Sequence, residues 1–181
     1  LVTRDRIDRN DRYSEAAVVN FGMMDLRPVT DDDVVLESPD PMVRAFRDFW
    51  ASKCSEGRLP SRSDFDVTEF QPWFGHVILM DVVEGGKDFR YRLIGTHITE
   101  FLRRDLTGKF VSACSFDRGQ AHVLDSFRRP LTTGAPVFRS GRLVWAVDQS
   151  WHQYNSVHCP LASDGITPDM TVGVVVFGQA G

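Results

Sequence analysis

The stretch DFRYRLIGTHITEFLRRDLTGKFV, residues 88–111, decides how this chain folds. Its first residues alternate as they do in a β-strand, with one face formed by Phe89, Tyr91 and Leu93 and the other by Arg90, Arg92 and Ile94. The alternation stops at Gly95-Thr96, and the residues that follow have the spacing of short helical pieces. We therefore expect a sheet strand that leads directly into a helical wall.

The same stretch contains Gly108-Lys109, a pair that also occurs in nucleotide phosphate loops. A phosphate loop needs a further glycine five residues earlier and a Ser or Thr after the lysine, because backbone N–H groups must wrap the phosphates. Here Arg103 stands in place of that glycine, and Phe110 follows the lysine. We therefore interpret Gly108-Lys109 as a turn in a helical segment.

A helix is predicted over residues 40–56, ahead of this stretch. Asp40 can cap its N-terminus, Pro41 suits its first position, and Gly57 suits its end. Apolar side chains recur at three- and four-residue spacing and form one stripe: Met42, Val43, Phe46, Phe49 and Trp50. A stripe of this area must be covered, either by the sheet of the same chain or by a second protomer.

The elements that follow indicate a mixed fold. Asp66 and Glu69 have the spacing of a capping box for a short helix that ends near Pro72. A longer helix is predicted over 119–135. Strands are predicted over 76–84, 89–95, 136–144, 146–161 and 170–178. Hairpins at both ends and helices in the middle predict an α+β fold with one five-stranded antiparallel sheet.

Length and composition fit one domain with an appended helix. We divide the 181 residues into a polar N-terminal arm (1–39), a flanking helix and connector (40–74) and a sheet domain (75–181). The net charge of −4, with Lys and Arg spread along the chain, argues against a nucleic-acid partner. No apolar run approaches the roughly 18 residues that span a membrane, and no signal segment opens the sequence, so we expect a cytoplasmic protein.

Three motifs resemble a known family: LPSRSDFD (59–66), FRYRLIGTHITEFLRRDLTGK (89–109) and CPLASDG (159–165). With the order of the elements, they are similar to the PAS domain superfamily, and within it to a small bacterial family of single-PAS-domain proteins. The resemblance implies a PAS-like sheet with helices on one face, preceded by a flanking helix like the one expected at 40–56. It also implies a sensory or ligand-binding module, and leaves its ligand and output open.

Residues that could hold a cofactor or a metal are few and scattered. Cys54, Cys114 and Cys159 lie far apart and form no CxxC pattern, so we expect neither a zinc site nor a disulfide framework. Flavin-binding PAS domains carry an adduct-forming cysteine, but the ACSFDRG context of Cys114 lacks their pattern. His122, in the long predicted helix, is the candidate axial ligand for haem. We predict no metal and no cofactor, and keep haem and flavin as alternatives.

The resemblance places a ligand pocket between the concave face of the sheet and the helical middle of the chain. Such pockets are mainly apolar, with a few convergent polar groups. We predict ligand contacts from Arg92, Phe101, Trp151 and Tyr154, with Arg92 pairing an acidic group of the ligand. The alternatives are a solvated Arg92 and core roles for the three aromatic residues, since a one-residue slip exchanges the two faces of a strand.

We expect a PAS-type sensor that binds a small apolar or amphipathic molecule and signals through a partner protein. A homodimer through the helix at 40–56 is expected, and the alternative is a helix that packs only on its own domain. A second hypothesis is an interaction or dimerisation module without a ligand, whose interior is filled by the chain's own aromatic residues. A small enzyme is the third, but no GxSxG nucleophile motif occurs, and we predict no catalytic residues.

Overall fold

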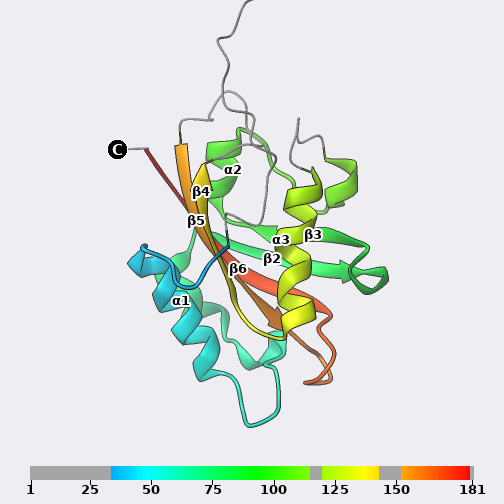
Figure 1. The fold of residues 1–181 in the computed structure, drawn as a ribbon. Coiled ribbons are helices and arrows are strands. Elements are labelled where there is room, and N and C mark those ends of the chain that lie inside the picture. Colours follow the sequence, from blue (N-terminus) through cyan, green and yellow to red (C-terminus); the bar gives the residue numbers. More distant parts are fainter. Residues whose placement is uncertain (1–33, 115–119, 143–151, 180–181) are drawn as a thin grey trace, which may run out of the picture.

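The computed structural model describes residues 34–114, 120–142 and 152–179. At its centre is an antiparallel sheet of six strands in the order β1-β4-β5-β6-β2-β3 (Figure 1). The strands are β1 (Val34–Val35), β2 (Val77–Val83), β3 (Asp88–Ile94), β4 (Val137–Arg142), β5 (His152–Leu161) and β6 (Met170–Gln179). The α+β class and the antiparallel sheet are confirmed, with one strand more than predicted. That strand, β1, lies in the predicted polar arm and pairs with Phe138 and Arg139 of β4.

Helices cover both faces of the sheet (Figure 1). One face carries α2 (Thr96–Leu102), the 3₁₀ turn η5 (Val111–Ala113) and α3 (Gln120–Thr133). The other carries α1 (Pro41–Ser52) and the 3₁₀ segments η2 (Arg62–Asp64) and η3 (Val67–Trp73), while η4 (Glu84–Gly86) links β2 to β3. Successive residues of β2 belong to the two separate cores: Val77 and Leu79 to the α1 side, Ile78 and Met80 to the α2–α3 side. In the described part of the chain, no helix has both the length and the apolar character needed to cross a membrane.

The apolar stripe of α1 packs on the sheet of its own chain. Phe46 is fully buried, and the indole Nε1 of Trp50 donates to the carbonyl of Pro160 on β5 at 3.0 Å. Phe49 stacks on Trp73 of η3, with 5.0 Å between the ring centroids. Of the two arrangements that the sequence left open, the structure therefore has the helix on its own domain. The stripe needs no second protomer to cover it, and the homodimer stays a prediction.

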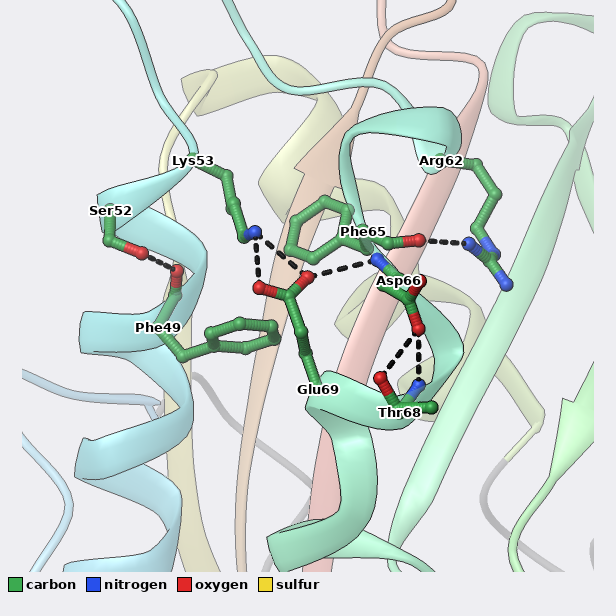
Figure 2. Close-up of polar contacts among 8 residues, drawn as sticks. All are labelled: Phe49, Ser52, Lys53, Arg62, Phe65, Asp66, Thr68 and Glu69. Atoms are coloured by element: carbon green, nitrogen blue, oxygen red, sulfur yellow. Dashed lines mark hydrogen bonds and ion pairs between the residues drawn. The ribbon is translucent and has the colours of Figure 1, made fainter.

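Figure 2 shows how the end of α1 is tied to the start of η3. Lys53, the residue after α1, places its Nζ 2.7 and 2.8 Å from the two carboxylate oxygens of Glu69. Glu69 also accepts from the backbone N–H of Asp66 at 2.9 Å, and Asp66 accepts from the backbone N–H of Thr68 at 2.8 Å. The capping box expected at Asp66 and Glu69 is confirmed. The hydrogen bond from Lys53 holds the pKa of Glu69 below its ordinary value.

Replacing Asp40 by alanine should lower the free energy of unfolding by about 1 kcal/mol. Asp40 Oδ1 accepts from the backbone N–H groups of Met42 at 2.8 Å and Val43 at 3.1 Å, and alanine would remove this acceptor from the start of α1. Urea denaturation followed by circular dichroism measures the loss. The control is Asp48→Ala, an exposed change on the same helix, which should stay within about 0.5 kcal/mol of wild type. Equal losses in the two variants would contradict the capping role.

Candidate ligand-binding site

A β-bulge in β3 decides which of its side chains face α2 and α3. The pairing of β3 with β2 skips one residue at Arg92. Beyond it, Leu93 is exposed, and Ile94 is buried in the same core as Tyr91. The strict alternation expected from Phe89 to Ile94 is therefore wrong after Tyr91, because the additional residue exchanges the faces of those that follow.

Arg92 lies on the exposed side of β3. Its side chain is 56 % exposed, and its Nη1 is 3.1 Å from Oδ1 of Asp81 on β2. The neighbouring Arg90 bonds the other oxygen of the same carboxylate at 2.7 Å. The bulge and this ion-pair cluster keep Arg92 at the surface, so its predicted inward position is wrong.

Helix α2 is held against the sheet at both ends. At its start, Gly95 donates its backbone N–H to the carbonyl of the first residue of β2 at 2.8 Å. One residue into the helix, His97 Nδ1 and His76 Nε2 share a hydrogen bond of 2.9 Å. At its end, the ring of Phe101 stacks on Phe177 of β6, with 3.8 Å between centroids. These contacts fix the apolar side of α2 over the sheet.

A cavity of about 70 Å³ lies between the sheet and the helices α2 and α3. The sheet and α2 supply its apolar walls: Ile78, Ile94, Ile98, Leu102, Val175 and Phe177. Polar side chains also border it: Tyr91, Ser126, Arg139, Tyr154, Ser156 and His158. The volume is several times what one water molecule requires.

Most of these polar side chains come from the neighbouring strands β4 and β5. Tyr154, Ser156 and His158 occupy every second position of β5 and therefore share one face. Arg139 of β4 pairs directly with Ser156. The side chain of Arg139 is 2 % exposed, and its Nη2 is 3.0 Å from Oδ2 of Asp125 on α3. A buried cation therefore borders a largely apolar cavity.

Burial favours the neutral forms of two further titratable groups of the cavity, His158 and Tyr91. It lowers the pKa of His158 to about 3, with a further contribution from the charge of Arg139. Burial also raises the pKa of Tyr91 above its ordinary value. The imidazole and the phenol are therefore uncharged at neutral pH, and Arg139 carries the only formal charge among the described lining residues.

A comparison with known protein families matches this architecture. A family model described as a PAS domain matches residues 39–176, which include α1 and nearly all of the sheet. The chain belongs to the PAS domain family. PAS domains are sensory and signalling modules and are generally non-catalytic. The resemblance to the PAS domain superfamily is thereby confirmed. A comparison with curated proteins found no match.

Of the four side chains that the sequence predicted as ligand contacts, the structure describes three, and one of these lines the cavity. Tyr154 borders it directly. Phe101 lies behind the wall, stacked on the lining residue Phe177. Arg92 is at the surface, and Trp151 lies outside the described residues. A ligand contact from Tyr154 or Phe101 stays a prediction.

Arg139 is the lining residue that sequence reasoning missed. The sequence feature that could have identified it is a charged residue inside the segment VFRSG (137–141). Such a charge indicates either a solvated strand face or a buried ion pair, and the sequence pattern does not distinguish them. Only the pairing of β4 with β5 and the contact with Asp125 place it inside the domain.

The cofactor alternatives depend on Cys114 and His122. Cys114 is buried next to η5, where its thiol donates to the carbonyl of Phe110 at 3.2 Å and burial raises its pKa. The side chain of His122 lies outside the described part of the structure. Within the described residues, no three His, Cys, Asp or Glu side chains gather as a metal site requires.

Proposed function

We propose that this PAS domain binds a small molecule in the cavity between the sheet and the helices α2 and α3, and signals its occupancy to a partner protein. The proposal is carried by the convergence of Arg139, Tyr154, Ser156 and His158 on a cavity with mainly apolar walls. Small-molecule sites have this composition, because apolar walls supply affinity and a few polar groups fix orientation. A volume of about 70 Å³ suits a ligand of a few heavy atoms.

Binding explains this site better than catalysis does. A hydrolytic nucleophile needs a base within hydrogen-bond reach. The hydroxyl of Ser126 donates instead to the carbonyl of Val123, at 2.6 Å. With a pKa of about 3, His158 is a weak base at neutral pH, far from the value at which general-base catalysis works best. These groups suit recognition of a ligand rather than proton transfer.

Helices α2 and α3 are the elements through which a ligand would act on a partner. Both contribute to the cavity wall, α2 through Ile98 and α3 through Phe127. α3 is tied to the rest of the domain by Asp125, which pairs with Arg139, and by Arg128, whose Nε donates to the carbonyl of Gly86 at 3.0 Å. A ligand that prefers one of two positions of these helices would shift the equilibrium between them.

We place this sensor in the cytoplasm. Cys54, Cys114 and Cys159 are all free thiols. Free thiols are typical of a reducing compartment, whereas disulfides persist in oxidising ones. The partner protein would then be a cytoplasmic one.

A protein-interaction module without a ligand is the second candidate. The specific observation in its favour is the small size of the cavity, about 70 Å³, which the aromatic rings of Phe127 and Phe177 already narrow. Such a module would act through its surface alone. Its cavity would then be a packing defect with no occupant.

Filling the cavity separates the two candidates. Val175 of β6 borders the cavity, and Val175→Phe adds an aromatic ring there. We expect native mass spectrometry to detect a small molecule that is retained by the purified wild-type protein and absent from Val175→Phe. The control is Val67→Phe, on the exposed side of η3, which should retain the molecule. An empty wild-type protein, together with a Val175→Phe variant at least as stable, would favour the interaction module.

A further inference from the structure

We infer that the ligand of this cavity carries a carboxylate and that Arg139 binds it. The inference rests on the proposed function and names the class of ligand, a small monocarboxylic acid with an apolar remainder. It assigns to Arg139 the role that the sequence suggested for Arg92, because Arg139 borders the cavity whereas Arg92 lies at the surface.

Arg139 is placed to serve a second carboxylate besides that of Asp125. Its side chain is 2 % exposed, and a buried guanidinium is costly unless acceptors surround it. The Asp125 oxygen that lies 3.0 Å from Arg139 Nη2 also lies 3.3 Å from Nε of Arg129. A guanidinium presents several N–H groups in a planar fork, and can hold Asp125 and a ligand carboxylate together.

A further group of the cavity, the imidazole of His158, is suited to donate a hydrogen bond. Nδ1 of His158 lies against Gly173 and has no hydrogen-bond partner in the part of the chain that the structure describes. We therefore assign the single proton of this neutral imidazole to Nε2, where it can reach an acceptor. A cation with a neutral donor beside it suits a ligand group that only accepts hydrogen bonds, as a carboxylate does. The same groups would repel a cationic ligand group.

The part of the ligand beyond the carboxylate would contact apolar side chains. Apolar side chains of the sheet and α2 form the remaining walls: Ile78, Ile94, Ile98, Leu102, Val175 and Phe177. A sugar or a phosphate ester would bring several further polar groups into contact with these walls, where their loss of hydration would not be offset. Short-chain acids combine one carboxylate with a compact apolar part of a few heavy atoms, and therefore suit both the polar and the apolar walls of the cavity.

Calorimetric titration of the full chain with matched acids and amides tests this assignment. The probes are acetate and acetamide, propionate and propionamide, and butyrate and butyramide, which differ within each pair mainly in the charge offered to Arg139 and have the few heavy atoms that the cavity suits. We expect at least one acid to bind about tenfold more tightly than its amide, because hydrogen bonds to charged groups are stronger than neutral ones. Arg139→Met should remove this preference, and Arg139→Lys should keep part of it. Arg92→Met is the matched control and should keep it in full.

The outcomes separate this inference from the proposed function. If acids and amides bind the wild-type protein equally, the carboxylate assignment is wrong while the cavity remains a binding site. If none of the three acids binds, the assignment is also wrong, and the mass spectra of wild type and Val175→Phe decide the proposed function independently. Because the acid–amide comparison in the wild-type protein needs no variant, it stays decisive even if Arg139→Met fails to fold.

Discussion

Replacing Gly95 by alanine is expected to destabilise the protein by at least about 3 kcal/mol. A Cβ at this position would lie 2.3 Å from the carbonyl carbon and oxygen of Gly75 and 2.8 Å from the backbone nitrogen of His76. These are backbone atoms, so no side-chain rotation relieves the overlap. Gly95 has φ −64°, which any residue adopts, so the close approach of two chain segments, and not conformational freedom, requires glycine here.

Gly95→Ala should lower the free energy of unfolding and also disturb the cavity wall, because Gly95 joins β3 to α2. The overlap would move α2, and with it Ile98, away from the sheet. Urea denaturation measures the stability, and retention of the small molecule that we expect to copurify reports on the cavity wall. Gly178→Ala on β6 is the matched control, since a Cβ there meets no atom within 4 Å. A Gly95→Ala variant within about 1 kcal/mol of wild type would show that the two segments can separate at little cost.

The features that the sequence predicted correctly depend on neighbours in the chain. Asp40 caps α1 through residues two and three positions away, and the capping box of Asp66 and Glu69 closes within three residues. Period-two and helical patterns also found the five longer strands and the helices, because each pattern is complete within its own segment. β1 was missed, since two valines form a strand only by pairing with β4, more than a hundred residues later.

The candidate ligand-binding site could be predicted only in part, because it depends on the register of the strands. Nothing in the sequence marks the bulge at Arg92, which is defined by the pairing of β3 with β2. Without the bulge, Arg92 and Ile94 would share one face of β3. Because Ile94 lines the cavity, Arg92 would then be expected to face the cavity as well. For Arg139, the alternation along β4 shows which residues share its face, but it does not show whether α3 packs on that face. Tyr154 borders the cavity, as aromatic side chains commonly do, and its role as a ligand contact stays a prediction.

The packing of α1 also depends on contacts between residues far apart in the chain, which the local sequence pattern does not show. Its stripe indicated a buried face, and left open whether the sheet or a second protomer covers it. The deciding contact, from the indole of Trp50 to the carbonyl of Pro160, joins residues 110 positions apart. Amphipathic spacing indicates that one face of a helix is buried, but it does not indicate which segment or protomer packs against that face.

The lowered pKa of His158 should make the free energy of unfolding depend on pH. Its pKa is about 3 in the folded protein, against an ordinary value of 6.5, because the buried imidazole near Arg139 resists protonation. Below pH 6.5, the unfolded chain binds a proton at this residue that the folded chain does not. The stability that His158 contributes is therefore fully present above pH 6.5 and falls as the pH falls toward 3. The expected loss between pH 7 and pH 5 is about 2 kcal/mol.

Urea denaturation at half-unit steps between pH 7 and pH 5 measures this loss. The interval stays above the range in which carboxylates with lowered pKa values, such as Glu69 and Asp88, begin to contribute. His158→Gln keeps a polar side chain without the titration, and should show a slope smaller by up to about 1.4 kcal/mol per pH unit. His97→Gln, at an exposed histidine of α2, is the matched control and should leave the His158 slope in place. If His158→Gln and wild type lose stability in parallel, the imidazole is protonated in the folded protein, and it would then add a second positive charge to the cavity beside Arg139.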